Sequence, residues 1–192
     1  LNDGAIDLVV IGTPDHEHAG QAIQAMKAGK HVLSEIPAAY EIAELEQLIA
    51  LEESQSLVYA MGNEVRWFSY LEAAKQMAID GYWGDIFHSE AGYLHNLRRE
   101  GWRESEPGTG EPHWRFDPAR PQTTFLGGGP HAFDTLRWLT GETNWKEVFA
   151  YGNVPYVDGH NEPANTVAIL KSASGLISKV ETSYVMVRPY SL

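Results

Sequence analysis

Hydrophobic residues in the first part of the chain alternate between short continuous runs and longer amphipathic stretches. Residues 6–11, 31–34 and 57–61 form short apolar runs, and each run predicts a β-strand. Between them, residues 19–26 and 41–54 place apolar side chains at helical spacing. Continuous hydrophobicity is typical of parallel strands that are covered on both faces. The pattern therefore predicts a doubly wound α/β arrangement of alternating strands and helices.

The rest of the chain carries further periodic segments. Apolar positions at helical spacing predict a helix over residues 67–81, and another helix is expected over residues 131–139, directly after three glycines. Gly175 is expected to form the turn between the last two of the remaining strands. These predicted strands are residues 86–97, 149–154, 166–172 and 176–184.

Turn-forming residues follow each strand of the first part. They are Gly12-Thr13-Pro14-Asp15, Glu35-Ile36-Pro37 and Gly62-Asn63. Either Thr13 or Asp15 is expected to cap the helix that follows, and Gly29 is expected to end that helix. Ligands of doubly wound sheets bind beyond the carboxyl ends of the strands. We therefore expect the three loops to face one crevice.

Charge and composition exclude several classes of protein. Lys and Arg total 14 against 26 Asp and Glu, and this net charge of −12 argues against nucleic acid as a partner. The chain has no cysteine, so disulfides, thiolate nucleophiles and cysteine-ligated zinc are excluded. No apolar run approaches the ~20 residues that span a bilayer, so no membrane association is expected. These features favour a cytoplasmic location.

A dinucleotide-binding sheet normally carries a G-x-G-x-x-G turn that binds the pyrophosphate. This motif does not occur, and the nearest glycine cluster, residues 127–129, does not follow a predicted parallel strand. Either the first part binds no dinucleotide, or its first half precedes Leu1. We favour the second alternative, and we expect this chain by itself to bind NAD weakly.

Three segments carry a recognisable combination of motifs. They are DLVVIGTPDHEH at residues 7–18, AGKHVLSEIP at 28–37 and GGGPHAFDTLRWLTG at 127–141. In order and spacing they resemble the Gfo/Idh/MocA family of NAD(P)-dependent sugar oxidoreductases. The resemblance implies a partial Rossmann domain over residues 1–62. It further implies an α+β domain over residues 63–192, with a mostly antiparallel sheet that is truncated at its end.

The same resemblance implies NAD or NADP as the cofactor and assigns residues to its binding. The expected cofactor-binding residues are Thr13, Pro14, His18, Glu35, Pro37 and Asn63. In the family, the residue between Glu35 and Pro37 is usually a lysine, which helps to relay the proton of the substrate hydroxyl. Here this residue is Ile36, which has no proton to give or take. The loop geometry is expected to persist without the chemistry of the lysine.

His131 is the expected catalytic residue, because the family uses a histidine at this place as acid and base on the substrate hydroxyl. The alternative is a histidine at a helix N-terminus that bonds only the backbone. Many members carry an aspartate four residues earlier, where this chain has Gly127. Asp134 follows His131 by three residues, so it is expected to share its helix face and to orient it.

The expected substrate-binding residues lie on the predicted strand over 86–97, in the long segment over 97–124 and beside His131. Tyr93 and His95 share one face of their strand by period two. Tryptophan and arginine in the long segment suit the stacking and hydrogen bonding of sugars, although a disordered acidic loop is the alternative. The residues are Tyr93, His95, Arg66, Trp114, Arg115 and Asp134.

We expect hydride transfer between NAD(P) and a sugar or polyol hydroxyl. Two alternatives stay open: a redox-neutral, NAD-dependent glycoside hydrolase or lyase of the same family, and a member that only binds sugar or cofactor. A metal hydrolase is disfavoured, because no H-E-x-x-H spacing occurs and His88 and His95 would point to opposite faces of a strand. The expected partners are a small sugar or polyol and further copies of the chain, joined through the C-terminal sheet.

Overall fold

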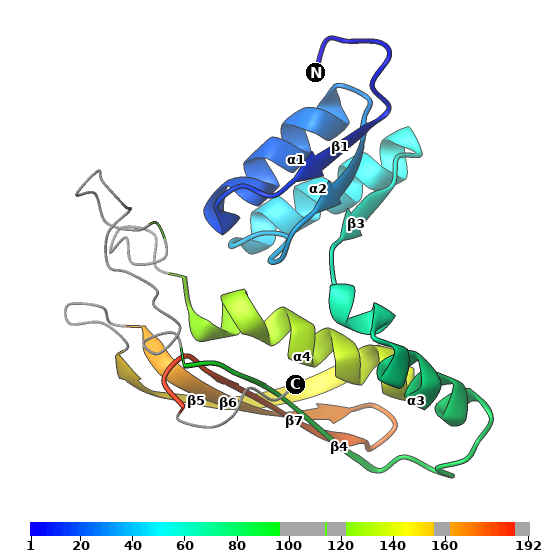
Figure 1. Cartoon of the computed structure of the whole chain (residues 1–192), viewed down its shortest axis with the longest axis vertical. Coiled ribbons are helices and arrows are strands. Elements are labelled where there is room, and N and C mark those ends of the chain that lie inside the picture. Colours follow the sequence, from blue (N-terminus) through cyan, green and yellow to red (C-terminus); the bar gives the residue numbers. More distant parts are fainter. Residues whose placement is uncertain (97–113, 115–121, 156–161, 187–192) are drawn as a thin grey trace. The chain divides into compact units, whose positions relative to one another are not determined.

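The structure, a computed structural model, describes residues 1–96, 114, 122–155 and 162–186. The chain folds into two compact units, Leu1–Asn63 and Glu64–Leu192 (Figure 1). The first unit contains a parallel sheet and the second a larger mixed sheet, so the fold is α/β followed by α+β. Among the described residues, no helix has the length and apolar character needed to cross a membrane.

The first unit is built from three short parallel strands and their connecting helices. The strands β1 (Leu8–Ile11), β2 (His31–Ser34) and β3 (Tyr59–Met61) pair in the order β1-β2-β3, and the helices are η1 (Asp15–Glu17), α1 (His18–Lys27) and α2 (Ile42–Gln55). This arrangement confirms the predicted alternation of strands and helices. β1 and β3 each begin two residues later than the sequence predicted.

The ends of the helices in this unit are determined by residues that are close to them in the sequence, although one predicted cap is absent. Gly29 ends α1 as predicted, with a φ of +75° that favours glycine. The side chains and backbone of Glu41 and Glu44 form a capping box at the start of α2. Neither Thr13 nor Asp15 caps a helix with its side chain, so that prediction was wrong.

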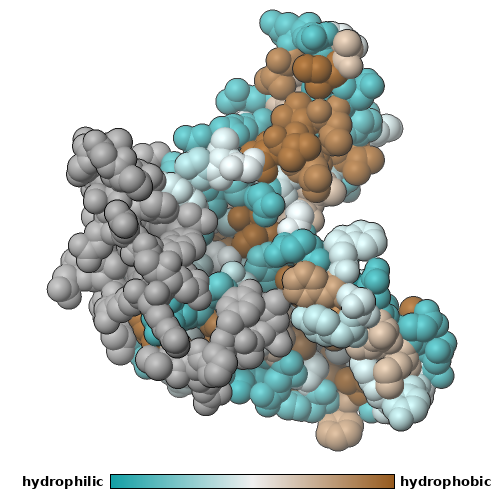
Figure 2. All heavy atoms as spheres, in the orientation of Figure 1, coloured by the Kyte–Doolittle hydropathy of each residue, from teal (hydrophilic) through white to brown (hydrophobic). Residues whose placement is uncertain are grey.

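The described residues cover only one face of the first sheet. The helices bury an apolar core against this face, formed by Ile11, Ala22, Ile23, Ala25, Met26, Val32 and Leu48. On the opposite face Leu8 and Val10 are 51% and 68% exposed, and the space-filling view shows apolar surface over this unit (Figure 2). The predicted burial on both faces is therefore wrong for the described chain. The connections from β1 to β2 and from β2 to β3 both proceed in the same direction along the sheet. Because such connections between parallel strands are right-handed, α1 and α2 lie on the same side.

The second unit is organised around a four-stranded sheet. Its strands are β4 (His88–Leu94), β5 (Trp145–Pro155), β6 (Pro163–Ser172) and β7 (Ile177–Ser183), in the order β4-β7-β6-β5. β7 runs antiparallel to β6, as β6 does to β5, while β4 and β7 are parallel. The sheet is thus mostly antiparallel, as expected. Gly175 forms the turn between β6 and β7 with a φ of +93°.

Several segments of this unit differ from their predicted boundaries, and β5 and β6 begin at Trp145 and Pro163, before the strands predicted from residues 149 and 166. The helix expected over residues 67–81 is divided into η2 (Glu64–Trp67) and α3 (Ser69–Ile79), because the backbone of Phe68 is extended. β4 is shorter than the predicted strand over residues 86–97, and Asn96 forms only an isolated bridge with Val185.

The long helix α4 (Thr124–Thr140) covers one face of the sheet. It packs Ala132 and Leu136 against apolar side chains of β6 and β7, including Leu170 and Val180. The helix begins well before His131, because the side chain of Thr123 caps it by accepting the N–H of Leu126 at 2.9 Å. The predicted start of this helix at His131 was therefore wrong.

Candidate functional site

The loops that follow the three parallel strands are tied together by their backbones. The N–H of Glu35, after β2, donates to the carbonyl oxygen of Ile11 at the end of β1, at 2.9 Å. The N–H of Gly62, after β3, donates to the carbonyl oxygen of Ser34 at 2.7 Å. The three predicted loops therefore lie at one edge of the sheet, where nucleotide-binding sheets of this class hold their ligand.

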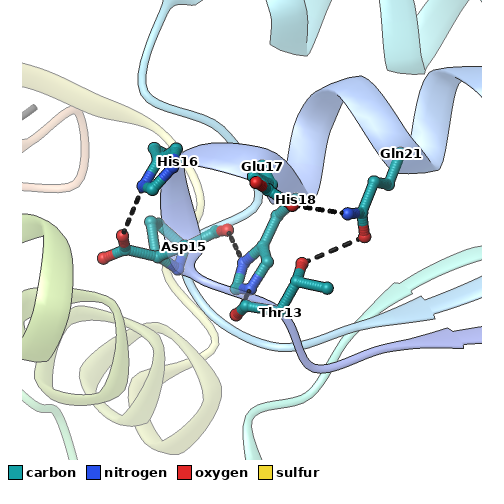
Figure 3. A network of polar contacts seen from close by, with 7 residues as sticks. Thr13, Asp15, His16, Glu17, His18 and Gln21 are labelled. Atoms are coloured by element: carbon teal, nitrogen blue, oxygen red, sulfur yellow. Dashed lines mark hydrogen bonds and ion pairs between the residues drawn. The ribbon is translucent and has the colours of Figure 1, made fainter. Parts of the chain in front are cut away.

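His18 lies beneath two of these loops. Its imidazole is only 1% exposed, with Nδ1 at 3.0 Å from the carbonyl oxygen of Pro37 and Nε2 at 2.9 Å from that of Thr13 (Figure 3). The Thr13 hydroxyl donates to Gln21 Oε1 at 3.0 Å, and Gln21 Nε2 donates to Glu17 at 2.7 Å. This network connects the loops to α1, so His18 contacts protein backbone where a cofactor contact was expected.

The remaining predicted cofactor residues present groups that suit a nucleotide. The Asn63 side chain is 7% exposed, and its Oδ1 has no hydrogen-bond partner among the described residues. A buried acceptor of this kind needs a donor, and a ribose hydroxyl supplies one. Glu35 is exposed at the same edge. In the same loop, the peptide bond between Ile36 and Pro37 is cis. The residues present therefore fit a dinucleotide.

In the second unit, three ring side chains from β4 and α4 stack on one another. The ring of Tyr93 lies 4.6 Å from that of His95 and 5.4 Å from that of His131, with interplanar angles of 23° and 24°. The shared face of Tyr93 and His95 confirms the period-two prediction. His131 is buried, and its Nδ1 lies 3.8 Å from a carboxylate oxygen of Glu64.

Two glycines of α4, Gly127 and Gly128, allow the side chains of Tyr184 and Tyr93 to approach the helix backbone closely. A Cβ on Gly127 would overlap the hydroxyl of Tyr184 and lie 2.8 Å from Cδ of Gln122, and a Cβ on Gly128 would overlap the ring of Tyr93. Tyr184 and Gln122 were not predicted as site residues. The glycine run was the signal that could have found them, because glycine inside a helix marks close approach of another group.

Asp134 has a different partner from the one predicted. Both of its carboxylate oxygens accept hydrogen bonds from the guanidinium of Arg66, which follows β3 in the chain. Hydrogen bonding to Asp134 raises the pKa of Arg66. Asp134 therefore does not orient His131, and Glu64 is the carboxylate that faces the imidazole.

Arg66→Ala is expected to lower the free energy of unfolding by about 1–3 kcal/mol, because it leaves a buried carboxylate without its partner. Chemical denaturation measures this change. Lys171→Ala removes an ion pair with Glu147 in which both side chains are more than half exposed, and should cost less than about 1 kcal/mol. Equal losses in the two variants would contradict a special role for the Arg66–Asp134 pair.

Of the two residues predicted in the long segment, the structure describes one. Trp114 is described and half-buried, while Arg115 lies outside the described residues. His131 also lines a mostly apolar cavity of about 160 Å³ together with Val65, Leu71 and Ala132. The second unit therefore combines a buried imidazole, a nearby carboxylate and stacked rings, the groups that an acid–base site for a hydroxyl substrate uses.

The parallel sheet of the first unit and the helix-covered mixed sheet of the second are each matched by a family model. Residues 1–63 match the model of the oxidoreductase family with an NAD-binding Rossmann fold, and residues 71–192 match that of the GFO/IDH/MocA C-terminal domain. The chain therefore belongs to the Gfo/Idh/MocA family, whose cofactor is NAD or NADP.

Individual relatives carry sugar-related names. The chain is 27% identical over 211 residues to a glycosyl hydrolase family 109 protein of Shewanella pealeana, covering 100% of the chain and 45% of that protein. It is 34% identical over 115 residues to an α-N-acetylgalactosaminidase of Shewanella oneidensis, covering 60% of the chain and 24% of the relative. The chain thus spans less than half the length of these curated relatives.

Solved structures show the same fold. The aldose-aldose oxidoreductase from Caulobacter crescentus, complexed with glycerol, superimposes with a TM-score of 0.80 at 22% identity. The superposition covers 96% of this chain and 52% of the other. At this identity the likeness establishes the architecture of both units.

Proposed function

We propose that the protein containing this chain oxidises a sugar or polyol hydroxyl with NAD(P), and that His131 is the acid–base residue. The observation that carries the proposal is the buried imidazole of His131, stacked on Tyr93 with the Glu64 carboxylate 3.8 Å from its Nδ1. We assign the proton exchange to Nε2 of this ring. A histidine titrates in the range where it can both accept and return a proton.

Each residue has a separate task in this proposal. When bound, the nicotinamide would supply the acceptor for the hydride of the sugar carbon. Thr13, Pro14, Glu35, Pro37 and Asn63 hold the cofactor at the edge of the parallel sheet. His131 accepts the proton of the substrate hydroxyl, and the Glu64 carboxylate stabilises the imidazolium that results. Ile36 contributes no proton transfer, so His131 carries this step without a lysine.

Binding of the substrate falls to residues around His131. Tyr93 and His95 offer a stacked ring surface that suits the apolar face of a sugar. Arg66 and Asp134 satisfy each other's charges, so we assign them to holding α4 near η2. Trp114 and Arg115 remain proposed sugar contacts from the long segment.

A second candidate is the redox-neutral cleavage of a glycoside. Two observations favour it: the relatives named as glycosyl hydrolases, and Ile36 in place of the usual lysine. In this reaction a sugar hydroxyl is oxidised, the acidified neighbouring C–H loses its proton, and the glycosidic leaving group departs. Return of the hydride and addition of water then restore the sugar, so no net NADH is formed.

Parallel assays separate the candidates. The protein is incubated with NAD and a panel of sugars and polyols, and reduced cofactor is followed by its absorbance. A matching panel of nitrophenyl glycosides, including N-acetylgalactosaminides, reports release of the leaving group. Accumulation of NADH supports the dehydrogenase, and nitrophenol release without NADH supports the glycosidase. Binding of NAD with neither activity would reject both and favour the non-catalytic alternative.

We also propose that the chain forms oligomers through the sheet face opposite α4. Phe149 and Tyr151 lie on that face, 62% and 70% exposed, with their rings in an edge-to-face contact at 4.9 Å. Exposed aromatic pairs are typical of interfaces. Phe149→Lys is expected to shift sedimentation toward the monomer, whereas Val148→Lys, 68% exposed on the other face of β5, should not. A monomeric wild-type protein would contradict this proposal.

A further inference from the structure

The surroundings of His18 place an acceptor at both ring nitrogens. Nδ1 and Nε2 face the carbonyl oxygens of Pro37 and Thr13 at 3.0 and 2.9 Å, and the side chain is 1% exposed. A carbonyl oxygen only accepts hydrogen bonds, and a neutral imidazole carries a single N–H. In the neutral form one nitrogen lone pair would therefore point at a carbonyl oxygen at hydrogen-bonding distance. The imidazolium, with two N–H groups, satisfies both contacts.

His31 provides an internal contrast in the same unit. Its Nδ1 accepts the backbone N–H of Val58 at 3.0 Å, so that nitrogen must keep its lone pair. His31 opens β2, at the end of the strand opposite the loop that contains Pro37. The backbone thus offers acceptors to both ring nitrogens of His18 and a donor to Nδ1 of His31.

We propose that His18 is an imidazolium brace that fixes the Thr13 loop and the Pro37 loop to each other. It is a positioning residue rather than a cofactor contact. The bonds join Thr13, in the loop after β1, to Pro37, in the loop after β2. Pro37 directly follows Ile36 in that second loop. Two charge-assisted hydrogen bonds offset the loss of hydration of the buried ring.

The charged groups around His18 are consistent with a cation at this place. The dipole of α1 opposes a positive charge at its first residue. Two neighbouring carboxylates act in the other direction: Asp15, which is buried in η1, and Glu17, which accepts a hydrogen bond from Gln21 (Figure 3). His16 is the other titratable group of η1, and its Nδ1 lies 4.0 Å from Asp15.

The consequence for the cofactor rests on the proposed function. If the two loops hold the nicotinamide, the brace presets their separation before the cofactor arrives, and loss of the brace weakens binding without removing a direct contact. The brace itself is a property of the first unit. It can be tested without any cofactor, so a negative redox assay leaves it standing.

The decisive measurement is the long-range proton–nitrogen correlation spectrum of the histidine rings in the complete chain at neutral pH. We expect both His18 nitrogens to show the shift of a protonated nitrogen. His31 should show one protonated nitrogen and one that carries a lone pair. A lone-pair nitrogen in His18 would overturn the proposal.

Amide hydrogen exchange supplies a second readout. His18→Phe keeps a flat aromatic ring but has no N–H. The backbone N–H of Glu35 donates to the carbonyl oxygen of Ile11, and we expect its exchange rate to rise about tenfold in this variant. Tenfold is the factor that corresponds to one net hydrogen bond. His31→Phe also loses one ring contact and should leave Glu35 unchanged. Equal effects of the two variants would contradict the brace. If His18→Phe does not fold, the ring spectrum of the unaltered chain still decides.

Discussion

Gly127→Asp is expected to lower the free energy of unfolding by about 2–4 kcal/mol, although the resemblance implies that many members of the family carry an aspartate there. The reason is steric and electrostatic. The first carbon of the new side chain would overlap the hydroxyl of Tyr184, which is 6% exposed, and its carboxylate would enter a space already occupied by Gln122. Denaturant unfolding followed by tryptophan fluorescence measures the loss.

Two controls separate overlap from helix propensity. Gly20→Ala lies in α1 with open space at its Cβ, and should be neutral or stabilising by up to about 1 kcal/mol. Gly127→Ala makes the same chemical change in α4 and should destabilise. Adding Tyr184→Phe should recover part of this loss, because it removes the overlapping oxygen. A Gly127→Asp protein as stable as the wild type would show that Tyr184 does not occupy this space.

His131→Gln is expected to lower the rate of sugar oxidation or glycoside cleavage by about 10²–10⁴-fold, the usual contribution of a general acid–base residue. Glutamine retains a polar side chain but neither accepts nor returns a proton near neutral pH. The steady-state rate in the protein containing this chain is the measurement, with circular dichroism to confirm folding. Because both candidate reactions begin with a proton leaving a hydroxyl, the prediction holds for either.

His88→Gln is the matched control for this variant. His88 belongs to β4 like Tyr93, but it is exposed and faces Glu90 at 3.6 Å. Its replacement should leave the rate within about twofold, as for a typical surface substitution. An active His131→Gln protein would remove His131 from the proposed chemistry, and the stacked rings would then serve only to bind.

Local pattern predicted most of the fold of the first unit. The limits of β2 agree with the prediction, because HVLS, with Val32 and Leu33 at its centre, is bounded by Gly29-Lys30 and Glu35-Ile36-Pro37. Both α-helices were recognised from their spacing. The exposure of one face of the sheet was not predicted. A run of apolar residues shows that both faces of a strand could be buried, but it does not show on which side of the sheet the connecting helices pack.

The candidate site was predictable only where its parts are close in sequence. The stacking of Tyr93 and His95 follows from the period of a strand, so it was found. The contacts of Arg66 with Asp134 and of Glu64 with His131 join α4 to residues that precede β4, and no spacing rule connects such positions. The start of α4 was missed because three glycines usually mark a turn, whereas here they admit two tyrosines to the helix backbone.

The composition of α4 has a consequence for how the site assembles. Its first half contains Gly127, Gly128, Gly129 and Pro130, residues that form isolated helix poorly, whereas the second half is rich in strong helix formers. The second half can therefore begin as local helix, while the first half acquires helical shape only when Tyr93 and Tyr184 pack on it. His131 lies at the junction of the two halves. We therefore expect the proposed base to reach its working position only when these two tyrosines have packed against the helix.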